Sequence, residues 1–181
     1  MTRIETGIPD LVVLEPRVFG DDRGFFLESW NQRTFTDIGL DPGFVQDNHS
    51  RSARGVLRGL HFQNPNPQGK LVRVVAGRAW DVAVDLRRSS STFGQWHGVE
   101  LSAANHLLFW VPSGFAHGFL SLEDGTDFLY KCTSFYEPAS ERSLLWNDPE
   151  LAIAWPLDGL EPQLSDKDAA GLPLSAIEPF A

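Results

Sequence analysis

The chain has 181 residues, of which 42% are hydrophobic and 22% charged, a length and composition that suit a single folded domain. Its one cysteine, Cys132, excludes an intramolecular disulfide framework and a cysteine-rich zinc site, and it fits a reducing cytoplasm. The formal net charge of -9 disfavours nucleic acid and anionic membranes as partners. No run approaches the roughly 18 consecutive apolar residues of a membrane helix. We therefore expect one cytoplasmic domain over residues 1–181, without a signal segment, that binds neither nucleic acid nor membrane.

Short segments bounded by Gly, Pro, Asn and Asp recur along the chain at about 8–12-residue spacing, which is typical of a β-sandwich or barrel. In chain order, the patterns predict a short helix over 32–38, strands over 70–75, 80–86, 106–111, 115–122 and 128–136, and a helical turn opened by a capping box at 165–168. Within 80–86, alternation places Trp80 and Val82 on one side of the strand and Asp81 and Ala83 on the other. Together these segments predict an all-β jelly-roll barrel with a few short helices.

A first polar cluster surrounds His61 and Lys70, in segments 55–63 and 68–70. A hairpin across the intervening Pro-Asn-Pro turn would bring the two side chains near each other. Histidine is the natural general base at neutral pH, and lysine offers a compact positive charge to an oxyanion. A half-buried core histidine and a solvated strand lysine are an equally open interpretation.

A second cluster spans residues 110–119, where the spacing Pro112-x-Gly114-x-x-His117 resembles the second motif of the cupin superfamily. In cupins that histidine often binds a metal, together with a His-x-His pair and a carboxylate. Here Phe62 and Gln63 follow His61, and a lysine stands where the carboxylate is expected. A nearby cation repels a divalent metal, so the pattern favours a cupin barrel without one, and a metal-dependent oxygenase is the alternative.

Two further features complete a candidate active site. Tyr130 sits at an inward strand position, where it is either a proton donor or a core tyrosine with a satisfied hydroxyl. Basic side chains gather in the N-terminal half of an otherwise acidic chain, near Gln46 and Asn48, and suit phosphate oxygens if they are not ordinary surface residues. They are Arg23, Arg51, Arg54, Arg58, Lys70 and Arg73. A base, a cation, a phenol and an anion-binding set indicate proton abstraction next to a carbonyl on a phosphorylated ligand.

The ordered motifs of the chain resemble the dTDP-4-dehydrorhamnose 3,5-epimerase family over nearly its whole length. The segments that carry the resemblance are 22–26, 46–50, 55–63, 68–73, 80–87, 115–119, 130–133, 155–156 and 164–168. Any one of these segments alone is a weak signal, but so many in the same order make a specific match.

The resemblance implies a role for each matching residue. His61 matches the family's general base, Asp168 the carboxylate paired with it, Lys70 the residue near the sugar 4-oxo group, and Tyr130 the proton donor. Positions that contact the nucleotide or the sugar match Arg23, Phe25, Glu28, Gln46, Asn48, Arg58, His117, Tyr136, Glu141 and Lys167. The family forms a homodimer with exchanged N-terminal strands, so residues near Arg23 are expected to reach the partner's site. Either Phe135 or Tyr136 is expected to stack on thymine.

The implied substrate is dTDP-4-dehydro-6-deoxyglucose, inverted at carbons 3 and 5 through an enolate, without cofactor or metal. This is the step to dTDP-4-dehydro-L-rhamnose in the synthesis of rhamnose for cell-wall polysaccharide. Three alternatives remain beside it. The first is an epimerase of a single carbon or a ketoisomerase in another deoxysugar pathway, the second the metal-dependent oxygenase, and the third a non-catalytic barrel that binds nucleotide sugars.

Overall fold

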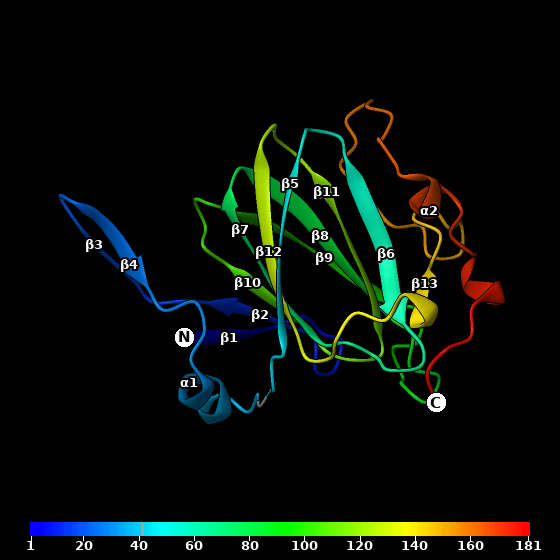
Figure 1. Cartoon of the computed structure of the whole chain (residues 1–181), viewed down its shortest axis with the longest axis horizontal. Coiled ribbons are helices and arrows are strands. Elements are labelled where there is room, and N and C mark those ends of the chain that lie inside the picture. The colour runs from blue at the N-terminus through cyan, green and yellow to red at the C-terminus, as the bar shows by residue number, and fades with distance from the viewer. Residues whose placement is uncertain (41) are drawn as a thin grey trace.

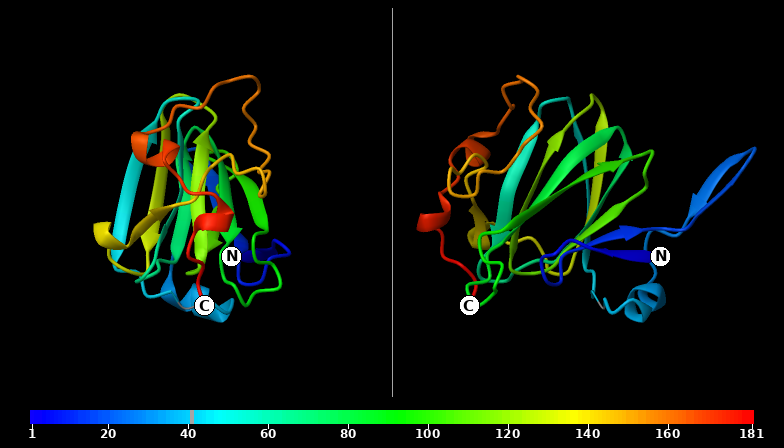
Figure 2. Two further views of the ribbon diagram at one scale, coloured as in Figure 1. Left: turned by 90° about the vertical axis from the view of Figure 1, so that its right-hand side faces the viewer. Right: turned by 180° about the vertical axis from the view of Figure 1, so that it is seen from behind.

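Two antiparallel sheets form the body of the computed structural model, which describes residues 1–40 and 42–181 (Figures 1 and 2). Across the six-stranded sheet, the strands are β1 (Thr2–Glu5), β2 (Val12–Glu15), β10 (Leu108–Val111), β7 (Lys70–Ala76), β12 (Thr126–Cys132) and β5 (Gln46–Ser52). Across the five-stranded sheet, they are β13 (Glu141–Ser143), β6 (Leu57–Gln63), β11 (Phe115–Ser121), β8 (Arg78–Asp85) and β9 (Trp96–Ser102). This is the two-sheet jelly-roll barrel that the spacing of the strands predicts.

The main hydrophobic core fills the space between the two sheets. Inward positions alternate along the strands, so that Val72 and Val74 of β7 meet Ala79 and Ala83 of β8 from the facing sheet. Phe119 and Phe128 stack with ring centroids 4.0 Å apart at the end of this core. Beyond these two rings the interior side chains become polar, so the barrel is apolar at one end and hydrophilic at the other.

Chain outside the barrel covers both sheets. The C-terminal segment, with Leu144, Leu151 and Leu174, packs on the outer face of the five-stranded sheet and carries the helical turn α2 (Asp166–Ala169). Helix α1 (Gln32–Asp37) covers the six-stranded sheet with its buried Phe35. Two 3-10 turns, η1 (Pro138–Ser140) and η2 (Leu174–Ala176), lie in the C-terminal part. No helix among the residues described is long and apolar enough to cross a bilayer.

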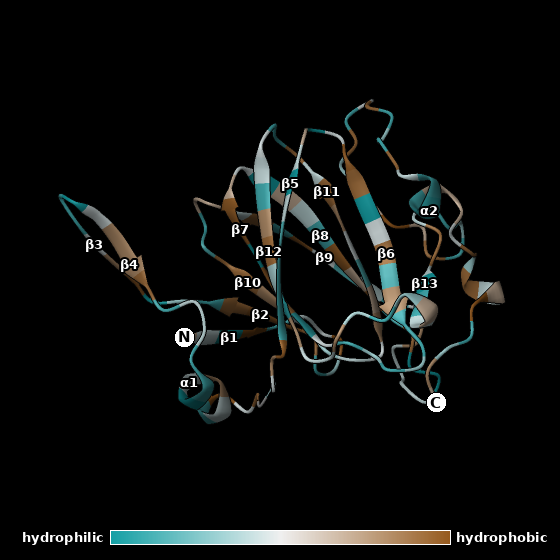
Figure 3. Cartoon of the chain, viewed as in Figure 1, coloured by the Kyte–Doolittle hydropathy of each residue, from teal (hydrophilic) through white to brown (hydrophobic). Residues whose placement is uncertain are grey.

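The hairpin of β3 (Val18–Asp21) and β4 (Gly24–Leu27) projects away from the barrel, at the end opposite to the C-terminal segment (Figure 1). Its two strands pair only with each other. Three phenylalanines on it, Phe19, Phe25 and Phe26, are 50%, 61% and 70% exposed, and β4 is one of the hydrophobic segments of Figure 3. Phe25 contacts His106 of the barrel with ring centroids 4.6 Å apart, yet all three rings stay at least half exposed. A two-stranded ribbon with exposed aromatic rings is only marginally stable in water, so this surface favours a packing partner.

Several sequence predictions need correction. His61 and Lys70 do not lie on one hairpin, because the turn between β6 and β7 carries the chain from one sheet to the other. The strand expected from 106 begins at Leu108, since His106 has a φ of 56° at the end of a turn held by Asn105. The strand expected to reach 136 ends at Cys132, and the residues after it, Thr133 and Ser134, bond to Gly69 and Gln68 of the loop before β7.

Candidate active site

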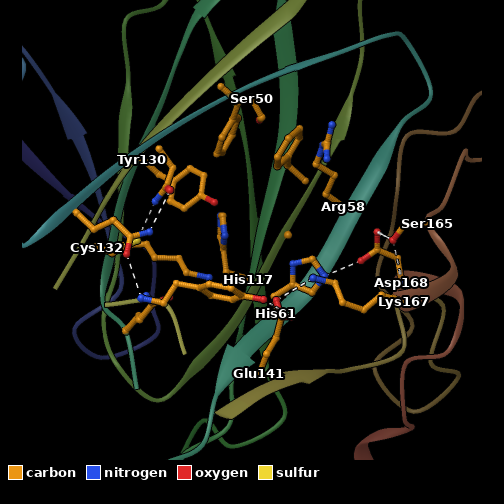
Figure 4. Close-up of a pocket in the computed structure, with 18 residues that line it drawn as sticks. Ser50, Arg58, His61, His117, Tyr130, Cys132, Glu141, Ser165, Lys167 and Asp168 are labelled. Atoms are coloured by element: carbon orange, nitrogen blue, oxygen red, sulfur yellow. Dashed lines mark hydrogen bonds and ion pairs between the residues drawn. The ribbon is translucent and has the colours of Figure 1, made fainter. Parts of the chain in front are cut away.

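A cavity of about 370 Å³ occupies the polar end of the barrel, between the two sheets (Figure 4). Strands from both sheets and the helical turn α2 supply its walls. Of the predicted site residues, the cavity is lined by His61, Tyr130, Asp168, Lys70, Gln46, Asn48, Arg58, His117, Tyr136, Glu141 and Lys167. The structure thus brings together side chains separated by up to two thirds of the chain, and leaves three predicted residues outside.

Alternation along β5 and β12 explains one wall. In β5, Gln46, Asn48 and Ser50 point inward. The residues between them, Asp47 and His49, bond to Lys131 and Asp127 on the outer face. In β12, the residues that line the cavity are Phe128, Tyr130 and Cys132. Both strands carry polar groups on both faces. The wall of the cavity is therefore hydrophilic although the two strands stay regularly paired.

A bulge in β6 places two side chains that simple alternation would separate. Arg58 and His61 are three residues apart, an odd spacing that turns side chains to opposite faces of a regular strand. The register between β6 and β11 shifts between the pair His117–His61 and the pair Phe119–Arg58. The extra residue lets both Arg58 and His61 line the cavity.

The imidazole of His61 is held by a buried carboxylate. Its Nε2 lies 2.6 Å from Oδ1 of Asp168, which also accepts the backbone N–H of Gly59 at 3.1 Å. Ser165 donates its hydroxyl to the other carboxylate oxygen at 2.6 Å and caps the helical turn. Burial opposes ionisation of Asp168, but the hydrogen bonds from His61 and Ser165 outweigh it and lower its pKa to about 2. Asp168 is therefore an anion that fixes the imidazole.

The hydrogen bonds of Ser165 and Asp168 also test the capping box predicted at 165–168. Ser165 is the N-cap residue and accepts the N–H of Asp168, as expected. The Asp168 carboxylate, however, faces His61 and Gly59 instead of the N-cap backbone N–H. The first turn of α2 therefore holds the Asp168 carboxylate in position against His61.

Lys70 and Tyr130 approach the cavity from the six-stranded sheet. Burial lowers the pKa of the Lys70 ammonium, which forms no hydrogen bond or ion pair with any residue described. Burial also raises the pKa of the Tyr130 phenol, so its hydroxyl keeps its proton at neutral pH. The imidazole of His61 enters from the opposite sheet. A base and a phenolic acid thus face one cavity from two sides.

Three side chains form a network at the mouth of the cavity. Glu141 accepts hydrogen bonds from Lys167 at 2.8 Å and from the Tyr136 hydroxyl at 3.0 Å. The backbone N–H of Tyr136 is bonded to the side chain of Gln46. Tyr136 lines the cavity, whereas Phe135 is 67% exposed and is not part of the lining. Tyr136 is therefore the ring placed to stack on a planar ligand at the mouth.

The three predicted residues outside this cavity belong to the N-terminal region. Arg23 and Phe25 lie on the projecting hairpin, where Arg23 pairs only with Asp21. Glu28 follows the hairpin and accepts hydrogen bonds from Asn31 and Thr34 at the start of α1. None of these three residues lines the cavity, and the ring of Phe25 lies instead against His106, with ring centroids 4.6 Å apart.

Several lining residues were missed from the sequence. They are Ser50, Gln68, Gly118, Phe119, Phe128, Cys132 and Ser165. The period of two from Gln46 and Asn48 would have found Ser50, whose buried hydroxyl has no hydrogen-bond partner in the structure. Asp81 was also missed as a site residue. It does not line the cavity itself, but both of its carboxylate oxygens are within 3.0 Å of Nε2 of His117, which does.

The histidines of the cavity are each bonded to a carboxylate, and Lys70 lies beside them. Among residues 1–40 and 42–181, no three His, Cys, Asp or Glu side chains converge as a metal site would require. Operation without a metal or cofactor remains a prediction from the sequence.

Similarity to known proteins agrees with this geometry. A sequence model described as dTDP-4-dehydrorhamnose 3,5-epimerase matches residues 5–176. The dTDP-4-dehydrorhamnose 3,5-epimerase of Salmonella typhimurium is 59% identical over 172 residues, which cover 94% of this chain and 93% of the relative. The chain belongs to the dTDP-4-dehydrorhamnose 3,5-epimerase family.

Two solved structures of related enzymes bear on the function. The dTDP-6-deoxy-D-glucose-3,5-epimerase of Legionella pneumophila, in complex with dTDP-4-keto-L-rhamnose, is 52% identical with a TM-score of 0.95 and covers 99% of this chain and 98% of its own. A 3'-monoepimerase from Streptomyces bikiniensis, in complex with dTDP-quinovose, is 38% identical with a TM-score of 0.88 and covers 93% of this chain and 86% of its own. The fold of this family therefore serves both double and single inversion.

Proposed function

We propose that the chain converts dTDP-4-dehydro-6-deoxy-D-glucose to dTDP-4-dehydro-L-rhamnose by inverting carbons 3 and 5, the reaction for which its family is named. The observation that carries this proposal is the opposed placement of the His61–Asp168 dyad and Tyr130 across one cavity that also contains Lys70. Inversion requires that a proton leave one face of the sugar ring and arrive on the other. A base in one sheet and an acid in the facing sheet meet that requirement.

His61 acts as the base. Its Nε2–H donates to Asp168, which leaves Nδ1 unprotonated to accept a proton from the carbon next to the ketone. The substrate's own carbonyl takes up the electron pair as an enolate, so the reaction needs no external electron acceptor. The Asp168 carboxylate stabilises the imidazolium that forms.

Lys70 and Tyr130 act on the enolate. The Lys70 ammonium stabilises the developing oxyanion, and its partial burial strengthens that interaction relative to water. The Tyr130 hydroxyl then delivers a proton to the other face of the ring. The same groups act at both carbons, because each is adjacent to the ketone.

The polar wall and the mouth bind the nucleotide half of the substrate. Arg58 presents a guanidinium fork to the diphosphate, with its Nε held by Ser52 at 3.1 Å. Gln46 and Asn48 offer amide groups from the neighbouring strand, His117 contacts the sugar, and Tyr136 stacks on thymine. Glu141 and Lys167 keep the Tyr136 ring in place through the network at the mouth.

We further propose a homodimer in which the β3–β4 hairpin packs on the partner subunit. The exposed rings of Phe25 and Phe26 would then be buried, and Arg23 and Glu28 would reach the partner's cavity. A cytoplasmic location fits the single reduced thiol of Cys132. The product then serves rhamnose synthesis for cell-wall polysaccharide.

Incubation with the substrate in deuterated water tests the function directly. NMR should show deuterium and inverted configuration at both carbons 3 and 5, and His61→Ala should show neither, since a positioned base contributes about 10²–10⁴-fold. Absence of label with the folded wild-type protein, while it binds dTDP, would leave a binding protein in place of an enzyme.

The second candidate is an epimerase of a single carbon, favoured by the likeness to the Streptomyces 3'-monoepimerase. The incubation in deuterated water distinguishes the two functions, because a single-carbon epimerase would introduce deuterium and invert the configuration at one carbon only.

A further inference from the structure

Asp81 is a completely buried carboxylate bonded to His117, which lines the cavity. Its solvent exposure is 0%, and its two oxygens lie 2.9 and 3.0 Å from Nε2 of His117. Other buried aspartates have full sets of partners: Asp85 has the Arg87 guanidinium and two hydroxyls, and Asp148 has three backbone N–H groups. Asp81 is bonded to one imidazole only, among the residues described. A buried anion is costly unless a positive charge compensates it.

Lys70 presents the complementary situation on the facing sheet. Its ammonium lines the same cavity as His117 but has no bonded anion in the described part of the chain. The titratable groups around it come from six elements. Five of these elements supply His61 (β6), His117 (β11), Asp81 (β8), Glu141 (β13), and Lys167 with Asp168 (α2). Tyr130 and Cys132 face it from β12.

Most of the acidic groups around Lys70 are already bonded to other side chains. Asp168 is bonded to His61, and Glu141 is bonded to Lys167 and Tyr136. Burial raises the pKa of the Cys132 thiol, which favours its neutral form. Lys167 repels Lys70. Among residues 1–40 and 42–181, Asp81 is therefore the buried acid acting on Lys70 that has no lysine or arginine bonded to it.

We propose that Asp81 is a positioning residue of the active site, which orients His117 and supplies the buried negative charge that keeps Lys70 protonated beneath the sugar ketone. This rests on the proposed function, because the role of Lys70 is to stabilise an enolate. Burial raises the pKa of Asp81 overall and lowers that of Lys70 overall. The attraction of Asp81 to His117 and Lys70 opposes the first shift, and the attraction of Lys70 to Asp81 opposes the second. The negative charge of Asp81 thus opposes the effect of burial on the Lys70 ammonium.

Lysine NMR tests this charge balance without any catalysis. The chain has three lysines, Lys70, Lys131 and Lys167, so 13Cε resonances of labelled protein give three resolvable titrations. In Asp81→Asn, the Lys70 titration should move to lower pH, and in Asp85→Asn it should stay where it is in the wild type. Asp85 is the matched control, since it is equally buried on the same strand but is bonded to Arg87, away from the cavity. An unchanged Lys70 titration in folded Asp81→Asn would overturn the proposal.

Kinetics provide the second measurement. Asp81→Asn should lower kcat by about 10–100-fold with a KM change below about threefold, as expected for loss of an orienting partner. In the pH profile of kcat for Asp81→Asn, the alkaline limb should move to lower pH together with the Lys70 titration. A purely structural role would lower the melting temperature and leave both the pH profile and the Lys70 titration in place, which would contradict the proposal.

The wild-type protein alone gives a third measurement, which applies even if Asp81→Asn does not fold. The 13Cγ resonance of Asp81 should report an ionised carboxylate at neutral pH and should shift again as Lys70 loses its proton, whereas that of Asp85 should not. A protonated Asp81 at neutral pH would overturn the proposal. Absence of epimerisation by the wild type would instead refute the proposed function and leave these titrations readable.

Discussion

The imidazole of His61 experiences opposing influences on its pKa. Burial and the nearby cations Lys167 and Lys70 lower it, whereas the Asp168 carboxylate raises it, and the net result is a pKa below the ordinary 6.5. A general base must be unprotonated to act. His61 is therefore ready to accept a proton at neutral pH, while Asp168 keeps it basic enough to take one from carbon.

This balance predicts the acid limb of the pH profile. Activity should fall only as the pH drops below 6.5, because the protonated fraction of His61 grows there. Asp168→Asn removes an influence that raises this pKa, so its acid limb should move to still lower pH. Its kcat should fall by about 10²–10⁴-fold, since the imidazole loses its fixed tautomer. Asp166→Asn, an exposed neighbour on the same turn, should behave as the wild type. An acid limb above 6.5 in the wild type would contradict this assignment.

Tyr130 offers a separate test of the acid. In Tyr130→Phe, deuterium exchange at the carbons next to the ketone should continue through His61, whereas inversion should slow by about 10²–10⁴-fold. The chain's other tyrosine is the control: Tyr136→Phe removes the bond to Glu141 at the mouth and should change KM without altering the ratio of exchange to inversion. Wild-type inversion by Tyr130→Phe would remove the phenol from the mechanism.

At the scale of elements, the bulge in β6 decides which side chains reach the cavity. Its backbone lies against β11 so closely that a Cβ on Gly118 would come within 2.5 Å of the Arg58 carbonyl oxygen and 3.0 Å of the Gly59 Cα. This contact sets the local path of β6. The same strand segment holds Arg58, His61 and the Gly59 N–H that binds Asp168.

We therefore expect Gly118→Ala to damage both stability and activity. The added methyl group must displace backbone, which costs about 1–3 kcal/mol of unfolding free energy, and the shift of β6 should lower kcat as well. Gly43→Ala is a matched control, because nothing lies within 4 Å of its Cβ position. Urea denaturation and steady-state kinetics would check both variants. Equal effects in the two variants would show that the close approach has no influence on the site.

Sequence patterns predicted the strands with one apolar face, such as β7, β8 and β11, because burial of that face imposes a period of two. They did not predict β5, whose seven residues from Gln46 to Ser52 are all polar. One face of β5 lines the cavity and the other forms ion pairs, so neither carries the hydrophobic signal. The positions of His61 and Lys70 were predicted from motifs, but their placement on facing sheets depends on topology. The contact of Asp81 with His117 depends on inter-strand register, which no local pattern reveals.

The whole molecule combines an acidic surface with a cavity that contains Arg58, Lys70 and Lys167. The net charge of -9 disfavours polyanions in general, while the converging cations favour a small one. A nucleoside diphosphate sugar meets both conditions, since it is small enough to enter the cavity and anionic enough to be held there.

Mixing of inactive variants tests the proposed exchange between subunits. Arg23→Ala and His61→Ala homodimers should each have low activity. After subunit mixing, a heterodimer should have one cavity with both defects and one with neither, so activity should reappear. If Arg23 served the cavity of its own chain, every cavity of the heterodimer would contain one defect. No recovery after verified mixing would therefore refute the exchange.

The His61–Asp168 dyad joins residues that lie 107 positions apart in the chain. Synthesis on the ribosome proceeds from the N-terminus, so the strand that carries His61 emerges long before α2. A growing chain can form much of the barrel while its base still lacks the carboxylate. Catalytic competence therefore arises only once α2 has been synthesised, and chains that are cut short before α2 are inert toward the sugar nucleotide pool.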